Sequence, residues 1–220
     1  MRLRGRRYNH IIDIHRVHQG KDLIVGQVNH QVGKGRITKI EDKFLEMDVA
    51  FVHDPPPALD VILILALARP IVLKRILADV TSMGIKKIFL VHSARVEKSF
   101  WKSHSLDPEN IRQQLFLGLE QAKDTMVPEV FLKRRFKPFV EDELPYLAQG
   151  RSAWVAHPGA SEGCPRHIAP PALLFIGPEG GWVPYEINLL EAQGLRAFHL
   201  GSRILRVETC VPYLISRFHC

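Results

Sequence analysis

The distribution of apolar residues divides the chain into two parts. Up to about residue 54, short apolar runs typical of β-strands are separated by polar turns. This spacing predicts a small β-barrel or sandwich. The expected strands span residues 11–17, 23–28, 36–40 and 45–51.

The pattern changes after Asp54-Pro55-Pro56-Pro57, a stiff segment that predicts a domain boundary. Beyond it, apolar runs alternate with stretches of helical periodicity, which predicts a parallel sheet with helices on its faces. We therefore expect one domain over residues 1–54 and a second over 58–220. The strands of the second are expected at residues 61–67, 88–91, 130–132, 154–156, 173–176 and 198–200.

Proline and glycine mark the ends of the helices in the second part. Proline suits the first turn of a helix, and glycine the position after its last turn. Gly84 and Gly194 are expected to end the first and third helices, and Pro212 to lie in the first turn of the last one. The expected starts are Pro70, Asp107-Pro108, Pro184 and Glu208-Thr209.

Two of the expected strands end in glycine-containing loops, Gly177-Pro178-Glu179-Gly180-Gly181 and Gly201. Ligands of open α/β sheets bind outside the carboxyl ends of the strands. The two loops therefore predict one pocket that holds a ligand through backbone groups, with Gly180 expected at φ > 0. The alternative is a plain turn, which a single Gly-Pro-x-Gly-Gly usually is.

The charge of the chain favours a polyanionic partner. Its formal net charge is +7, and four arginines lie in the first seven residues. That basic start is either a solvated tail or an arm that lies on phosphate. The same two interpretations apply to Lys133-Arg134-Arg135-Phe136-Lys137.

Other segments argue against membranes, disulfides and metals. The basic start is not followed by the apolar core of a signal peptide, and residues 61–68 are too short to span a bilayer. Cys164, Cys210 and Cys220 are widely spaced and form no CxxC, so no disulfide framework or zinc site is predicted. We expect a cytoplasmic protein without a metal.

The segments IGPEGGW, with Glu186 shortly after it, and LGSRILRVET resemble the paired C-terminal motifs of SPOUT methyltransferases. They are most similar to those of the ribosomal RNA small-subunit methyltransferase E family. This resemblance implies S-adenosylmethionine-dependent methylation of ring nitrogen N3 of a uridine in small-subunit (16S) ribosomal RNA. It extends over nearly the whole chain through residues 26–35, 69–75, 95–99, 118–121 and 157–158.

The resemblance also implies an architecture. It places a PUA-like β-barrel that holds RNA before a SPOUT parallel sheet with a C-terminal trefoil knot, in a homodimer whose site lies at the interface. The RNA partner is small-subunit rRNA or the assembled subunit. The chain lacks some residues that usually form the first strand of the small domain. The candidate RNA-binding residues are Arg4, Arg6, Arg7 and His10, of which the last two match an Arg-x-x-His pattern.

Uridine N3 is a poor nucleophile while it carries its proton, so catalysis must remove the proton or stabilise the anion. A guanidinium suits the second task because its planar fork faces the base carbonyls. Arg206 is the first candidate and Arg95 the second. Glu208 is the catalytic carboxylate we select over Glu97 and Glu120. All three are alternatively plain capping or exposed carboxylates.

For the cofactor, the resemblance selects the residues of the two loops and a His-Pro pair at the end of an earlier strand. His157 is alternatively an ordinary turn histidine. The cofactor-binding candidates are His157, Pro158, Ile176, Gly177, Pro178, Glu179, Gly180, Gly181, Leu200, Gly201, Ile204, Leu205 and Arg206.

Two other functions compete with methylation. A non-catalytic RNA-binding or ribosome-assembly factor on the same fold would not need intact glycine loops at residues 177–181 and 201–206. A dinucleotide-dependent oxidoreductase would carry G-x-G-x-x-G after an early strand, and the sequence has none.

Overall fold

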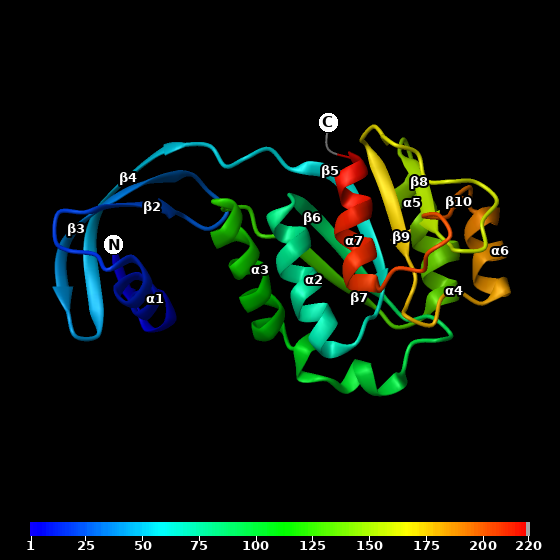
Figure 1. The fold of residues 1–220 in the computed structure, drawn as a ribbon, viewed down its shortest axis with the longest axis horizontal. Coiled ribbons are helices and arrows are strands. Elements are labelled where there is room, and N and C mark those ends of the chain that lie inside the picture. The colour runs from blue at the N-terminus through cyan, green and yellow to red at the C-terminus, as the bar shows by residue number, and fades with distance from the viewer. Residues whose placement is uncertain (219–220) are drawn as a thin grey trace. The chain divides into compact units, whose positions relative to one another are not determined.

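The structure, a computed structural model, describes residues 1–218. The chain forms two compact units (Figure 1). The first contains Met1–Pro56 and the short segment Lys123–Met126, and the second contains Pro57–Ala122 and Val127–Cys220. None of the helices within residues 1–218 has both the length and the hydropathy needed to cross a membrane.

The first unit is a curled antiparallel sheet with one helix. Its strands are arranged in the order β1-β4-β3-β2. The register shifts between β3 and β4 are of the kind that bends strands and increases twist. The apolar cluster of Val25, Leu45 and Met47 is packed by Tyr8 and Ile11 of the helix. The elements are β1 (Arg2–Arg4), α1 (Gly5–His15), β2 (Asp22–Gly26), β3 (Val32–Glu41) and β4 (Phe44–His53).

The prediction of a strand over residues 11–17 is wrong, because α1 occupies most of that range. Tyr8 and Ile11 are three residues apart, so they share one helix face and pack on the sheet together. Ile14 points away and is 66% exposed. Several isoleucines in a short stretch have a local preference for a β-strand. The helix forms instead because its apolar side chains bury the apolar face of the sheet.

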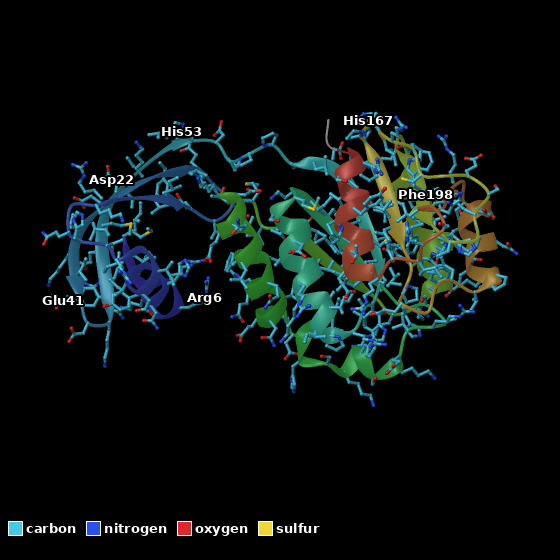
Figure 2. All side chains as sticks on the ribbon, in the orientation of Figure 1. Arg6, Asp22, Glu41, His53, His167 and Phe198 are labelled. Atoms are coloured by element: carbon cyan, nitrogen blue, oxygen red, sulfur yellow. The ribbon has the colours of Figure 1, made fainter. Side chains whose placement is uncertain are left out.

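The other three predicted strands of this unit form as β2, β3 and β4. The small β-barrel or sandwich expected here is found as a single curled four-stranded antiparallel sheet. Ion pairs cross it: Arg36 Nε donates to Asp22 Oδ1 at 2.8 Å, and Arg2 pairs with Glu46 at 2.5 Å. Figure 2 labels Asp22 and Glu41, whose exposed side chains lie on strands of this sheet, and Arg6, which lies on α1. The N-terminal residues are thus part of the folded unit and not a solvated tail.

The second unit contains a six-stranded parallel sheet in the order β10-β8-β9-β5-β6-β7. This confirms the α/β class. Ala172–Ile176, the whole of β9, is at most 2% exposed, as expected for a strand covered on both faces. The strands are β5 (Leu59–Ala66), β6 (Ile85–Val91), β7 (Glu129–Lys133), β8 (Ser152–Ala156), β9 (Ala172–Ile176) and β10 (Arg196–Phe198).

Helix α2 packs between α3 and α7 (Figure 1). Gly118 of α3 allows a close approach, because a Cβ there would lie 2.3 Å from the Ala78 carbonyl oxygen of α2. The helices are α2 (Pro70–Ser82), α3 (Pro108–Ala122), α4 (Phe136–Pro138), α5 (Leu144–Ala148), α6 (Pro184–Ala192) and α7 (Val207–Ile215). Short helical turns occur at η1 (Lys98–Lys102), η2 (His104–Leu106), η3 (Phe139–Glu143) and η4 (Ser216–Phe218).

The first three predicted helices of this unit begin where expected, and Gly84 and Gly194 have φ of +87° and +85° after the ends of α2 and α6. The last helix differs. Helix α7 begins at Val207, so Pro212 lies in its second turn and not in its first. There the missing N–H removes one internal hydrogen bond of the helix.

Candidate active site

A cavity of about 690 Å³ opens at the carboxyl edge of the parallel sheet. Segments that follow β5, β6, β8, β9 and β10 contribute to it, as does the start of α7. The carboxyl ends of parallel strands all meet at one edge, which explains how residues far apart in sequence come together there. All thirteen cofactor-binding candidates line this cavity, together with Arg95 and Glu208.

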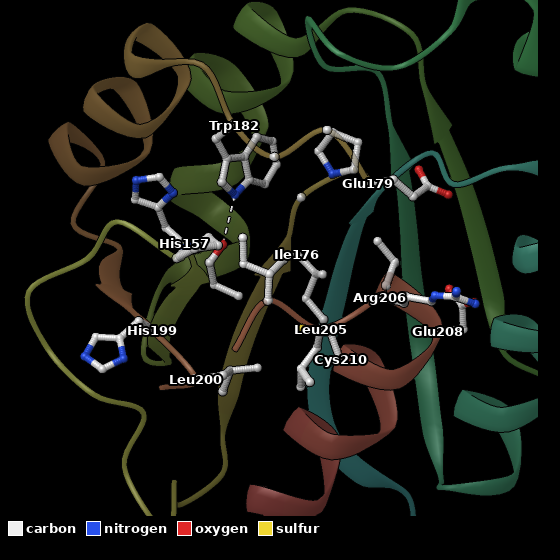
Figure 3. Close-up of a pocket in the computed structure, with 18 of the residues that line it drawn as sticks. His157, Ile176, Glu179, Trp182, His199, Leu200, Leu205, Arg206, Glu208 and Cys210 are labelled. Atoms are coloured by element: carbon white, nitrogen blue, oxygen red, sulfur yellow. Dashed lines mark hydrogen bonds between the residues drawn. The ribbon is translucent and has the colours of Figure 1, made fainter. Parts of the chain in front are cut away.

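The first loop, residues 177–182, is a tight turn packed against a tryptophan. The Gly181 N–H donates to the Pro178 carbonyl at 2.8 Å, and Gly181 has φ of +72°. The positive φ expected at Gly180 is therefore found at Gly181. Trp182 is 4% exposed, and its Nε1–H donates to the Ala156 carbonyl at 3.1 Å (Figure 3).

Gly177 has a packing role in the same loop. A Cβ at this position would lie 2.9 Å from the Trp182 indole. The indole also meets Phe175 edge-on, with ring centroids 5.1 Å apart. Glycine at position 177 therefore allows the tryptophan to seal the loop against β9.

Two further contacts hold the first loop from outside. Arg95 Nη1 donates to the Gly180 carbonyl at 2.5 Å. Glu179 Oε1 accepts the Arg69 N–H, at the start of α2, at 3.1 Å. The Glu179 carboxylate thus anchors the first loop to the start of α2.

Glu186, which the sequence indicated only as part of the first motif, is a buried residue that connects two segments of the site. Its side chain is 2% exposed. One carboxylate oxygen accepts the Ala94 N–H at 2.7 Å, and the other accepts the Val183 N–H at 3.1 Å. The carboxylate thereby joins the segment that carries Arg95 to the start of α6. An acidic residue at the third helical position is the capping-box signal that could have revealed this role.

The second loop, residues 199–206, is more open. His199 Nδ1 accepts the Gly201 N–H at 2.9 Å, and Gly201 has φ of +99°. Ile204 is 84% exposed, whereas Leu200 and Leu205 are partly covered. In Figure 3, Ile176, Leu200 and Leu205 lie between His157 and His199 on one side and Arg206 and Glu208 on the other.

Arg206 is the N-cap residue of α7, and its carbonyl accepts the N–H groups of Thr209 and Cys210. Its side chain is exposed and has no hydrogen bond or ion pair within the described part of the chain. Arg206, Arg95 and Glu208 line the same cavity, whereas Glu97 and Glu120 are not among the described residues that line it. A guanidinium at the rim of an apolar pocket can face a substrate that carries developing negative charge.

Several lining residues were not predicted from sequence. Most of them precede or follow a predicted site residue directly, so the carboxyl-edge rule could have included them. These residues are Arg69, Val72, Ala156, Trp182, Phe198, His199, Arg203, Val207 and Cys210.

Cys210 contributes an inert thiol to the pocket. Burial, followed by the neighbouring Cys164, raises the pKa of the Cys210 thiol to about 11. Both cysteines are free. A thiol with this pKa is protonated at neutral pH and is a poor nucleophile. Within residues 1–218, no group of three or more His, Cys, Asp and Glu side chains is placed to hold a metal ion.

The second unit, which holds the parallel sheet and its pocket, matches a known family. The family described as "RNA methyltransferase domain" matches residues 55–219. The fold, the pocket and this match define the class of protein as an RNA methyltransferase.

Relatives narrow the class. The chain is 30% identical to ribosomal RNA small subunit methyltransferase E of Treponema pallidum over 213 residues, which cover 94% of this chain and 79% of the relative. It is 26% identical over 149 residues to methyltransferase E 1 of Borreliella burgdorferi, covering 66% of this chain and 61% of that one. The chain belongs to the ribosomal RNA small subunit methyltransferase E family, which confirms the resemblance seen in its motifs.

The fold agrees with a solved structure of that family. A crystal structure of ribosomal RNA small subunit methyltransferase E from Neisseria gonorrhoeae bound to S-adenosyl methionine superposes with a TM-score of 0.76. The match covers 98% of this chain and 89% of the other, at 20% sequence identity. At that identity the likeness shows the shared fold.

Proposed function

We propose that this protein transfers a methyl group from S-adenosylmethionine to N3 of a uridine in small-subunit (16S) ribosomal RNA. The proposal rests on the cavity at the carboxyl edge, which is lined by two glycine loops and by Arg206, whose guanidinium has no partner among the described residues. Family membership supplies the reaction class and the rRNA substrate. The N3 position is our inference from the family resemblance.

The residues of the pocket fit S-adenosylmethionine. The cavity lies within the range of about 300–1,000 Å³ usual for small-molecule sites. Ile176, Leu200 and Leu205 supply apolar surface suited to an adenine ring. When bound, S-adenosylmethionine supplies an electrophilic methyl group on its sulfonium sulfur.

The chain itself must favour the N3 anion and hold the base in line. We assign Arg206 to direct its guanidinium at a carbonyl of the uracil and to stabilise the charge that develops on deprotonation. Arg95 already donates one N–H to Gly180, so its first role is to position the cofactor loop. Glu208, two residues beyond Arg206 in the first turn of α7, is the group we assign to accept or relay the proton.

We propose residues 1–54 as a PUA-like RNA-binding domain and residues 58–220 as the methyltransferase domain. Support for the first comes from Arg4, Arg6, Arg7 and His10, which are all exposed on β1 and α1. Replacing these four residues with glutamine should weaken RNA binding and flatten its dependence on salt, while S-adenosylmethionine affinity stays constant. A salt dependence equal to that of the unaltered protein would remove these residues from RNA binding.

We propose that the C-terminal segment forms a trefoil knot. The segment of residues 157–171 makes backbone hydrogen bonds both to the residue that follows β10 and to the turn that follows α7. Glu162 and Cys164 bond to His199, and the Ile168 N–H donates to the Arg217 carbonyl. This arrangement is consistent with a loop that encloses the last helix. A crystal structure whose chain trace simplifies to a trefoil would establish the knot, and an unthreaded trace would refute it.

We further propose a cytoplasmic homodimer, on the basis of the family resemblance. Analytical ultracentrifugation at micromolar concentration should give twice the mass of the 25.1 kDa chain. A monomer that is fully active would contradict a site completed by a second copy.

The reaction is tested with purified protein and tritiated S-adenosylmethionine. Both naked 16S rRNA and assembled small subunits from a strain lacking this activity serve as substrates. Mass spectrometry of the nucleosides should detect 3-methyluridine. Binding of the cofactor and of RNA without any methylation would instead favour an assembly factor.

A further inference from the structure

The basic run at residues 133–137 is divided by the structure into paired and unpaired cations. Lys133 pairs with Glu143 at 2.6 Å, and Lys137 lies 3.6 Å from Glu141. Phe136 packs inward against the rings of Phe175 and Trp182. Arg134 and Arg135 remain exposed and have no ion pair within residues 1–218.

Arg134 is held on a fixed aromatic surface. Its guanidinium carbon lies 5.4 Å from the centroid of the Trp101 ring. Trp101 is only 9% exposed, and its Nε1–H donates to His92 Nδ1 at 3.0 Å, which fixes the ring. A guanidinium that stacks through its face keeps its N–H edges available for an acceptor. Arg134 is therefore preorganised to bind an anion.

Two lysines flank the same tryptophan. Trp101 lies in η1, between Lys98 and Lys102, and both lysines are exposed without an ion pair among the described residues. We call Lys98, Lys102, Arg134 and Arg135 the η1 cationic patch. The exposed carboxylate of Glu97 directly precedes Lys98, and the nearest exposed acidic residues after Arg135 are Glu141 and Asp142, so cations predominate in each patch segment.

The η1 cationic patch lies on the same edge of the sheet as the pocket. Its residues follow β6 and β7 at their carboxyl ends, and Arg95, which begins the segment leading to η1, donates to Gly180 in the first loop. Arg95, which lines the cavity, and the patch residues Lys98 and Lys102 thus lie on one short segment of the chain.

We propose that the η1 cationic patch binds phosphates of the rRNA backbone next to the nucleotide that enters the pocket. This inference rests on the proposed function, because it names the second contact of the same RNA substrate. Guanidinium groups bind phosphate through two parallel N–H bonds, and lysines add charge without fixed geometry. The patch positions the RNA and takes no part in the chemistry.

The chain contains a matched control for this geometry. Arg196 lies over Trp154, with its guanidinium carbon 4.6 Å from the ring centroid, and Trp154 is 8% exposed. Arg196 begins β10, the edge strand at the opposite end of the sheet from β7, and it is not among the described residues that line the cavity. Arg134 and Arg196 are therefore both exposed and both lie over a buried tryptophan ring, but they lie at β7 and β10, the strands at opposite ends of the sheet.

The experiment compares Arg134→Gln/Arg135→Gln with Arg196→Gln in the full-length protein. Binding to a 16S rRNA fragment that carries the target is measured between 50 and 200 mM salt, conditions under which phosphate contacts dominate affinity. The double variant should lower the slope of log Kd against log salt by about 1.5, since each phosphate contact contributes about 0.7–0.9. Its KM for RNA should rise, while kcat and S-adenosylmethionine affinity stay the same. Arg196→Gln should change none of these.

Arg134→Lys separates charge from shape. It retains the cation but loses the planar fork, so the salt slope should stay unchanged while RNA affinity falls. An unchanged slope in the double variant, or an equal loss in Arg196→Gln, would overturn the proposal. If the double variant bound RNA as well as the unaltered protein does, the ligand of this surface would be an acidic protein and not RNA. If the unaltered protein binds RNA but does not methylate it, the proposed function fails and the binding comparison still decides the patch.

Discussion

The loop after β9 is held by contacts from three other segments, whereas the loop after β10 relies mainly on its own ends. Arg95, the Arg69 N–H and the Ala156 carbonyl all bond to residues 179–182. Residues 202–205 of the second loop make no hydrogen bond within the part of the chain that the structure describes. Held from outside, the first loop is preformed for a ligand, while the second can adjust.

This difference suggests a division of labour. A preformed loop binds a small cofactor with little loss of conformational entropy. The adjustable loop carries Ile204, which is 84% exposed, and ends at Arg206, whose guanidinium has no partner among the described residues. We infer that the first loop fixes S-adenosylmethionine, with Leu200 and Leu205 of the second loop covering its adenine, and that the part of the second loop around Ile204 adjusts when the uridine arrives. The predictions below test this comparison.

The largest effect is expected for Arg206→Ala. Loss of one preorganised donor to developing charge costs about 100- to 1,000-fold in rate. Single-turnover methylation at saturating cofactor and RNA should fall by this factor, with the melting temperature and cofactor affinity unchanged. Arg206→Lys should recover part of the rate because it restores charge without the planar fork. A rate near that of the unaltered protein would transfer the role to Arg95.

Glu186→Gln should loosen the attachment of the Arg95 segment to the start of α6, and so reduce the support of the first loop. The amide turns an N–H donor toward one of the two backbone N–H groups that the carboxylate now accepts. Leaving a buried donor unsatisfied costs about 1–3 kcal/mol in the free energy of unfolding. Denaturant unfolding should show this loss, and the cofactor Kd should rise. The control is Glu191→Gln on the exposed face of the same helix, which should be neutral.

Gly180→Val should displace the Arg95 side chain. A Cβ at position 180 would lie 3.1 Å from Arg95 Cβ and 3.3 Å from its Cδ. Losing the hydrogen bond from Arg95 to Gly180 should raise the Kd of S-adenosylmethionine about tenfold, since one such bond is worth about 0.5–1.5 kcal/mol. Calorimetry on the folded variant measures this change. Gly201→Ala serves for contrast: its Cβ meets nothing within 4 Å, so only the φ of +99° opposes it.

The last prediction concerns the reactivity of Cys210, which lines the cavity beside the second loop and needs no change at the site. Because its pKa is raised to about 11, the thiol is protonated until the pH approaches that value. At pH 8 it should be alkylated by iodoacetamide about 100-fold more slowly than an ordinary thiol. The rate should climb between pH 9 and 11 and fall when S-adenosylmethionine is added. A Cys164→Ser, Cys220→Ser background isolates the signal, and fast labelling at pH 7 would show that the thiol is not buried.

Most of the second unit could be predicted from local pattern. Buried parallel strands appear as continuous apolar runs, and Pro70, Pro108 and Pro184 mark helix starts because the ring suits the first turn. The first unit was harder. The Ile11 region satisfies both strand propensity and a helical face, and only the sheet beneath it favours the helix.

The α/β class, the strands and helix starts of the second unit, the two glycine loops and the family of this protein could all be predicted from the amino-acid sequence. These features depend on residues close together in the chain. The side chains that hold the pocket in place became known only from the folded structure. Glu186 meets Ala94 across 92 residues, Arg95 meets Gly180 across 85, and Arg134 meets Trp101. Such contacts depend on the order of the strands within the sheet, and periodicity along the chain carries no information about that order.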